Sequence, residues 1–236
     1  MKKTLLTLLF IPLLAFGAGA ELHLDKAPDR SGDMAALQHG AKLFINYCLN
    51  CHGASYMRYN RLTDLGLSEQ QIKDNLLFTT DKIGEQMKIS MQQSDAKVWF
   101  GAAPPDLTVI ARARASEFGS GADWLYTYLR TFYRDDSRPS GWNNVVFANV
   151  GMPHILWELQ GEQVMGPDHK LQLAKPGKLK PEEYDAAVAD LVGYLQFMGE
   201  PKAGLRKTLG VIVLIGLGII LVFAYALKRE FWKDIH

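Results

Sequence analysis

The sequence predicts a mainly α-helical domain with long loops, followed by one transmembrane helix. Two segments with clear helical periodicity, 34–50 and 181–198, bracket about 130 residues of weaker pattern that are rich in Gly, Pro and Asn. Near the C-terminus, residues 208–227 contain no charged side chain. With 236 residues, of which 48% are hydrophobic, the chain is long enough to bury one sizeable core.

The charge balance narrows the classes of partner. The 26 Lys and Arg residues against 25 Asp and Glu give a formal net charge of +1. The sequence contains no long basic run of the kind that neutralises phosphates. Nothing in it therefore indicates nucleic-acid binding.

The first helix is predicted over 34–50, where apolar residues recur at helical spacing and Ser31 or Asp33 can cap the start. The last helix of the domain is predicted over 181–198. Its proline suits the first helical turn, and the two glutamates that follow suit the positive end of a helix. Between the two, shorter helices are predicted over 68–76 and 122–132, and the rest is predicted to be loops.

The first twenty residues have the three-part form of a secretory signal peptide. A basic start is followed by an apolar stretch over 5–16 and by a small-residue cleavage site, Ala-Gly-Ala, that ends at Ala20. We predict that residues 1–20 are removed, the alternative being an uncleaved anchor. Residues 21–204 would then form a domain in the periplasm, outside a bacterial inner membrane.

The uncharged stretch 208–227 predicts a membrane anchor. Twenty helical residues at ~1.5 Å each span about 30 Å, the thickness of the hydrocarbon core of a bilayer. With its flanks we place the anchor at 205–229. A buried core helix is the alternative, but few soluble cores accommodate a helix that is apolar on all sides. Export of the domain would leave the tail, 230–236, in the cytoplasm.

Both cysteines of the chain lie in one motif, Cys48-Leu-Asn-Cys51-His52. A thioredoxin-like pair follows a strand, whereas here a predicted helix precedes the motif. A zinc site needs a second ligand pair, and a disulfide across two residues would be strained and would leave His52 unexplained. The remaining interpretation is a c-type haem, in which each thiol joins a vinyl group and the adjacent imidazole binds the iron.

The sixth ligand of such an iron decides its chemistry. An open position permits peroxide or gas chemistry, and a filled one leaves electron transfer. The candidates are the methionines and four further histidines, His23, His39, His154 and His169. Met152 is favoured because Gly151 and Pro153 place it on a rigid, extended turn. Core packing is the better interpretation of five other methionines: Met57, Met87, Met91, Met165 and Met198. A thioether ligand raises the reduction potential, as suits an electron carrier.

These motifs resemble the cytochrome c1 family, the membrane-anchored haem subunits of the cytochrome bc1 complex. The resemblance rests on CLNCHGASYMRYNRL, GAAPPDLTVIARAR and VGMPHILWE, and on the terminal anchor. It implies a class I cytochrome c-like helical haem domain with long loop insertions. In that fold Gly40 and Phe44 of the first helix cross Leu191 and Tyr194 of the last.

The resemblance also implies haem-binding roles for six residues. They are Cys48, Cys51, His52, Met152, Arg114 and Pro105. The thiols would attach one haem c, and His52 and Met152 would bind its iron. Arg114 would meet a propionate, the alternative being a solvated surface charge. The carbonyl of Pro105 or of its neighbour Pro104 would accept the Nδ1 proton of His52.

The implied function is electron relay in ubiquinol–cytochrome c oxidoreductase, from the Rieske iron–sulfur subunit through the haem to a soluble cytochrome c. The chain itself would make no bond, and cytochrome b would be its membrane partner in a dimeric complex. A stand-alone membrane-anchored cytochrome c shuttle is one alternative. A haem enzyme with an open iron position, such as a peroxidase, is another. Four acidic residues offer either a landing site for a basic cytochrome or a solvated surface. They are Asp135, Asp136, Glu158 and Glu162.

Overall fold

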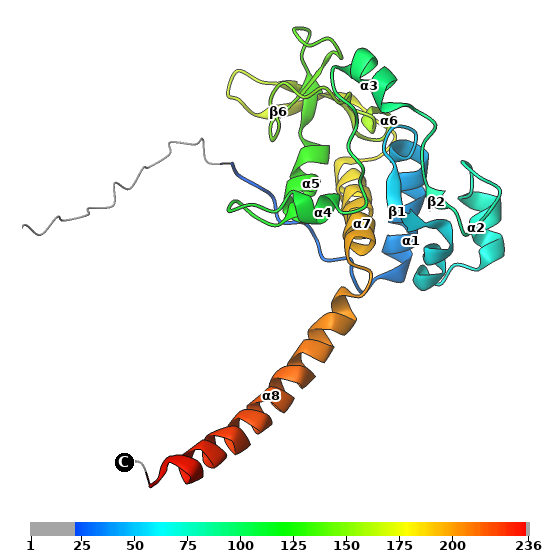
Figure 1. The fold of residues 1–236 in the computed structure, drawn as a ribbon. Coiled ribbons are helices and arrows are strands. Elements are labelled where there is room, and N and C mark those ends of the chain that lie inside the picture. Colours follow the sequence, from blue (N-terminus) through cyan, green and yellow to red (C-terminus); the bar gives the residue numbers. More distant parts are fainter. Residues whose placement is uncertain (1–21, 235–236) are drawn as a thin grey trace, which may run out of the picture.

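The computed structural model describes residues 22–234, so the predicted leader and its cleavage site lie outside the described residues. A mainly helical domain is followed by one long helix that extends away from it (Figure 1). The helices are α1 (Met34–Leu43), the π-helical turn η1 (Phe44–Cys48), the 3-10 helix η2 (Tyr59–Leu65), α2 (Glu69–Asn75), α3 (Gln93–Phe100), α4 (Ile110–Ala113), α5 (Gly121–Arg130), α6 (Trp157–Gln160), α7 (Pro181–Gly199) and α8 (Ala203–Trp232). The strands are β1 (Ala54–Arg58), β2 (Gln86–Met87), β3 (Phe132–Arg134), β4 (Trp142–Asn144), β5 (Gly161–Met165) and β6 (Leu171–Pro176).

The centre of the domain is the crossing of α1 and α7, which the family resemblance predicted. A Cβ atom on Gly40 would lie 2.1 Å from the backbone oxygen of Asp190, so only glycine permits this approach. Beside it, the rings of Phe44 and Tyr194 pack with their centroids 5.6 Å apart. Both rings are fully buried, and the crossing therefore locks the two ends of the domain sequence together.

Helix α5 packs against α7, and several of its side chains line the cavity described below. It begins with a capping box between Ser120 and Asp123, and Asp123 also accepts a hydrogen bond from the backbone of Ala27. At its other end, Arg130 binds both carboxylate oxygens of Asp185 on α7, at 2.6 and 2.8 Å. These contacts fix α5 between the N-terminal segment and α7.

The region predicted as loops contains short strands as well. Strands β4, β3, β5 and β6 form a sheet in that order, with β3 and β5 parallel and the other pairs antiparallel. In the view of Figure 1 this sheet lies at the end of the domain opposite α8. Strands of two to six residues leave too short a pattern to be seen in the sequence, and β3 and β5 pair across about 30 residues. The four predicted helices are confirmed within a few residues of their expected bounds.

Helix α8 is the predicted membrane anchor. It has 30 residues and a mean hydropathy of 2.8, and none of the apolar stretch is buried against the domain. It starts earlier and ends later than the predicted 205–229, so part of the predicted tail is helical. It is the one helix among residues 22–234 that is long and apolar enough to cross a membrane.

Candidate functional site

The Cys48–His52 motif lies at the end of the α1–η1 helix. The π-helical turn η1 widens the helix where the motif begins, since it ends at Cys48; such a local change is frequent at functional sites. The backbone N–H of His52 then donates to the carbonyl of Cys48 at 2.8 Å, which folds the motif into a tight turn. Both cysteines are free, and both line one cavity together with His52.

The imidazole of His52 is oriented by a backbone carbonyl. Its Nδ1 lies 2.7 Å from the oxygen of Pro105, which leaves Nε2 directed at the cavity. Burial lowers the pKa of His52, and the hydrogen bond to Pro105 opposes this shift. The neutral ring that results is the form in which histidine binds metals.

The segment of Pro105 is itself pinned by its neighbour Asp106. The carboxylate accepts from the backbone N–H of Ser55 at 2.7 Å and from that of Thr108 at 2.8 Å. Burial alone would raise the pKa of Asp106, but the hydrogen bonds from Thr108 and Ser55 outweigh it and lower the pKa. A charged Asp106 therefore fixes the carbonyl that orients His52.

The cysteine thiols differ in exposure. Cys48 is buried, and burial raises the pKa of its thiol to about 12, with a smaller contribution from nearby Cys51. Within residues 22–234 no group of three or more His, Cys, Asp or Glu side chains is arranged to hold a metal ion. The motif therefore fits covalent attachment better than zinc binding.

The opposite wall of the cavity is a loop between β4 and α6. Asn144 is 1% exposed; its side-chain oxygen accepts from the backbone N–H groups of Val146 and Phe147, and its amide donates to the carbonyl of Tyr128. The side chain of Asn143 accepts from the backbone N–H of Asn149 at 2.8 Å. Two buried asparagines thus shape the loop that presents Met152.

The thioether of Met152 meets one protein side chain from α5. The hydroxyl of Tyr128 donates to Sδ at 3.3 Å. Tyr128 is held by Trp124, whose ring stacks on it at 4.7 Å, and by Phe132, whose ring meets it edge-on at 5.0 Å. Burial raises the pKa of Tyr128 well above its usual value, so the phenol keeps its proton. The thioether retains a second lone pair for another partner.

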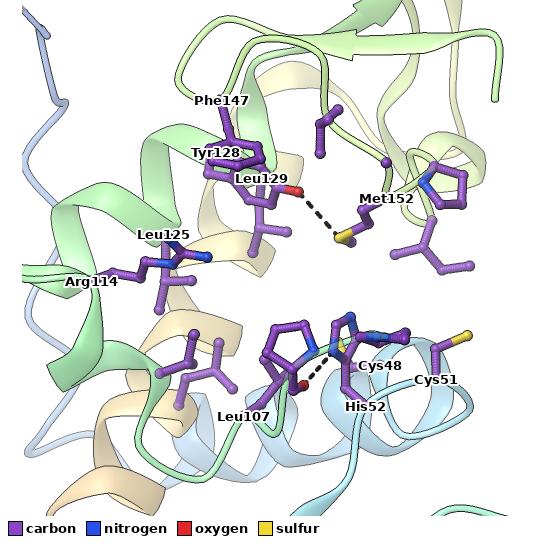
Figure 2. A pocket seen from close by; sticks show the side chains of 18 of the residues that line it. Cys48, Cys51, His52, Leu107, Arg114, Leu125, Tyr128, Leu129, Phe147 and Met152 are labelled. Atoms are coloured by element: carbon purple, nitrogen blue, oxygen red, sulfur yellow. Dashed lines mark hydrogen bonds between the residues drawn. The ribbon is translucent and has the colours of Figure 1, made fainter. Parts of the chain in front are cut away.

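The cavity between these walls has a volume of about 330 Å³, within the range of small-molecule sites. Figure 2 shows Met152 and His52 on opposite sides of the open space, with Arg114 extending into it from a third side. Apolar side chains make up most of the lining. They include Leu107, Ile110, Leu125, Leu129, Phe147, Val150, Leu191 and Leu195. A flat apolar group with a metal at its centre fits this arrangement.

The two arginines of the Arg-Ala-Arg sequence have different environments. Arg112 is exposed and lies 3.9 Å from Glu200. Arg114 lines the cavity, with its guanidinium 4.5 Å from the centre of the Trp124 ring. Among the described residues no carboxylate pairs with Arg114. A cation that faces an apolar cavity without an anionic partner in the described part of the chain suits a ligand that carries an anionic group, as haem propionates do.

The remaining predicted candidates lie elsewhere. None of the other described histidines lines the cavity: His23 is exposed, His39 binds Asp190, and His169 lies in the turn before β6. His154 is buried behind the Met152 loop, where burial lowers its pKa to about 4.

Three of the five methionines interpreted as core residues are in the core: Met57, Met87 and Met198. The interpretation was wrong for Met91, in a loop, and for Met165, on β5, which are only half-buried and lie outside the core. The acidic residues are explained by local partners. Glu162 pairs with Arg134 and Lys175, and Glu158 with Lys178. Asp135 accepts from Ser137 and Asn143. These local partners favour an ordinary charged surface over an acidic landing site.

Several residues that shape the site carry no signal in the sequence. They are Asp106, Tyr128, Phe147, Asn143 and Asn144. Their partners lie up to about 50 residues away in the chain, so neither motif nor periodicity reveals them. The segment PPDL was part of the family resemblance, but the pinning contacts of its aspartate appear only in three dimensions.

The helix crossing, the thiol and imidazole motif and the facing thioether define a membrane-anchored c-type cytochrome. The family model of the Cytochrome C1 family matches residues 26–235, and the chain belongs to this family. It is 45% identical over 250 residues to cytochrome c1 of Allochromatium vinosum, covering 100% of both chains. It is 51% identical over 237 residues to a Nitrosomonas europaea protein named ammonia monooxygenase gamma subunit, covering 100% of this chain and 99% of that one.

Among solved structures, a chain from "Hyperthermophilic respiratory Complex III" aligns with a TM-score of 0.42 at 17% identity, covering 85% of this chain and 77% of that chain. Family membership itself establishes the cofactor and the class of function. The chain carries one covalently bound haem c and is an electron-transfer subunit of the cytochrome bc1 type. Among residues 22–234, helix α8 is the one helix that fits a single-pass membrane anchor.

Proposed function

We propose that the cavity between the Cys48–His52 motif and the Met152 loop holds the haem. Cys48 and Cys51 would attach it, His52 and Met152 would bind its iron, and Arg114 would pair with a propionate. The observation that carries the proposal is the placement of His52 and Met152 on opposite walls of one apolar cavity. When bound, the haem supplies one-electron oxidation and reduction.

The residues of the chain would orient the haem and exclude water from it. The Pro105 carbonyl accepts the Nδ1 proton of His52 and fixes the tautomer that directs Nε2 at the metal. The apolar lining excludes water, and a low local dielectric strengthens the interaction of Arg114 with an anion. Because two protein side chains, His52 and Met152, would bind the iron, the site would serve electron transfer and not the binding of a substrate.

We propose the partners from family membership. Electrons would arrive from the Rieske iron–sulfur subunit and leave to a soluble cytochrome c. The long apolar helix α8 would pack beside cytochrome b in a dimeric complex. The signal-like residues 1–20 support an orientation with the domain 21–204 in the periplasm and the tail 230–236 in the cytoplasm.

The ligand assignment is tested by substituting Met152→Ala in the full-length holoprotein. We expect the far-red charge-transfer band of a thioether-ligated ferric haem to disappear and the reduced protein to bind carbon monoxide, while the covalent haem remains. Met91→Ala is the matched control, because Met91 lies in a loop and does not line the cavity. If Met152→Ala keeps the band, another residue is the ligand and the assignment fails.

The partner assignment is tested by extraction of the membranes in a mild detergent and identification of the proteins that co-purify. We expect a cytochrome b and an iron–sulfur protein. A haem protein that extracts alone would support the shuttle instead. The name of the Nitrosomonas relative supplies a third outcome, because recovery with ammonia monooxygenase subunits would replace the proposed complex with that one.

A further inference from the structure

The buried histidine beside the Met152 loop has no part in the function proposed so far. His154 is 2% exposed. Its ring lies face to face with Phe132, with centroids 4.9 Å apart and an interplanar angle of 6°. Trp142 meets it edge-on at 5.0 Å. A polar ring is thus built into an apolar position two residues after Met152.

The position of His154 argues against a direct role in binding. Met152, Pro153 and Ile155 line the cavity, and His154 does not. No His, Cys, Asp or Glu cluster suitable for a metal ion involves it within residues 22–234. Its ring contacts are to β3 and β4, the two strands that lead into and out of the turn behind the loop. These contacts tie the loop to the sheet.

The rings that pack against His154 also connect to the thioether of Met152, through Phe132 and Tyr128. Phe132 packs against His154 on one side and meets Tyr128 edge-on at 5.0 Å. The Tyr128 hydroxyl donates to Met152 Sδ at 3.3 Å. The backbone of the loop and the partner of the sulfur are therefore held by one contiguous set of rings.

At the far end of this set of rings, the cation of Arg134 packs on Trp142. The guanidinium of Arg134 lies 4.0 Å from the centre of the Trp142 ring and is itself paired with Glu162 at 3.0 Å. Trp142 is 5% exposed and cannot swing into solvent without breaking these contacts. A stacked ring at position 154 thus has fixed walls on both sides.

We propose that His154 is a positioning residue for Met152: it clamps the loop between Phe132 and Trp142 and holds the thioether at the site of the metal. This inference rests on the proposed role of Met152 as a ligand. It assigns His154 no contact with the haem and no proton transfer. It predicts that loss of the ring frees the thioether while the haem stays attached through the opposite wall.

The test compares His154→Ala, His154→Leu and His154→Phe in the full-length oxidised holoprotein. We measure the far-red thioether band, the covalently bound haem and the rate at which added imidazole displaces the native ligand. For His154→Ala we expect unchanged covalent haem, a weaker band and displacement faster by at least about tenfold, equivalent to about 1.4 kcal/mol. His154→Phe can still stack and should stay near the wild-type rate. His169→Ala, on an exposed turn, is the control.

His154→Leu covers the case in which the alanine variant does not accumulate, because leucine fills the space without stacking. We expect its displacement rate to lie between those of the phenylalanine and alanine variants. A purely structural role would lower the unfolding temperature and leave the displacement rate unchanged. Wild-type rates in both the alanine and leucine variants, or in the leucine variant alone if only it accumulates, overturn the proposal. Loss of the band in Met152→Ala reports on the ligand assignment separately.

Discussion

The two walls of the haem cavity are built in different ways. The His52 wall is local: the thiols, the imidazole and the turn that joins them lie within five residues at the end of one helix. The Met152 wall is a loop whose shape depends on residues from β3, β4 and α5. One wall is specified by a motif and the other by the fold.

This difference predicts different consequences of damage. Changes in the helix that carries the His52 motif act on the crossing of α1 and α7 and should affect the stability of the whole domain. Changes on the Met152 side should loosen a ligand and leave the domain folded, because loops open at a lower free energy than the packed core. The predictions below test this contrast, beginning with the largest effect.

Gly40→Val should have the largest effect. Its Cβ would lie 2.1 Å from the backbone oxygen of Asp190, so α1 and α7 must separate. We expect a loss of at least about 3 kcal/mol in the free energy of unfolding, or failure to accumulate holoprotein. Urea unfolding of the detergent-solubilised chain measures it. Gly32→Val is the control, since nothing lies within 4 Å of that Cβ. Equal stability of the two variants would remove the crossing from the account.

Asn144→Ala should mainly affect the Met152 wall. The substitution leaves the backbone N–H groups of Val146 and Phe147 and the carbonyl of Tyr128 without their buried partner. We expect a loss of about 2 to 3 kcal/mol in the free energy that keeps the Met152 loop closed. The thioether band should weaken at urea concentrations at which the far-UV circular dichroism is still native. A single transition seen by both signals would show that the loop has no independent stability.

Asp106→Asn should have a smaller effect on the His52 wall. Asparagine keeps one acceptor oxygen but loses the charge that receives the N–H groups of Ser55 and Thr108. Because Asp106 is exposed, solvent screening limits the loss in the free energy of unfolding to about 1 kcal/mol. The folded-state pKa of Asp106 is lowered. The contribution of charged Asp106 to the free energy of unfolding is therefore fully present above its unfolded-state pKa of about 3.9. It declines as the pH falls through the lower pKa of the folded state. Equal variant and wild-type stability at pH 7 would contradict this role.

The contrast between the walls also explains what the sequence could predict. The CxxCH motif, the helices over 34–50 and 181–198 and the apolar anchor depend on local spacing or uniform composition, so the sequence predicts them directly. The crossing of the two helices follows only from the family resemblance. Among local signals, only the flanking glycine and proline favour Met152, and the family resemblance adds to them. The residues that shape its loop were not visible, because Asn144 and Tyr128 act through contacts formed after folding.

The short sheet was missed for a related reason. Strand β3 has three residues and pairs in parallel with β5 at one position, Arg134 with Val164. Such a strand shows no detectable alternation, so the region resembled loops. Yet β3 supplies Phe132, and β4 supplies Trp142 and Asn144, which support the Met152 wall. The least predictable part of the fold therefore supports the least predictable ligand.

Arg114→Gln should have the smallest effect on folding and a measurable effect on the haem, and it belongs to neither wall. Its cation faces the cavity without a carboxylate partner among the described residues. A positive charge near the iron favours the ferrous state, which carries one more electron. Removal should therefore lower the midpoint potential, by less than the ~60 mV that corresponds to a tenfold change for one electron. Redox titration of Arg114→Gln measures the shift. Arg112→Gln is the matched control, because Arg112 is exposed and lies beside Glu200. Equal shifts in the two variants would mean that only net surface charge matters and that Arg114 makes no specific contact with the haem.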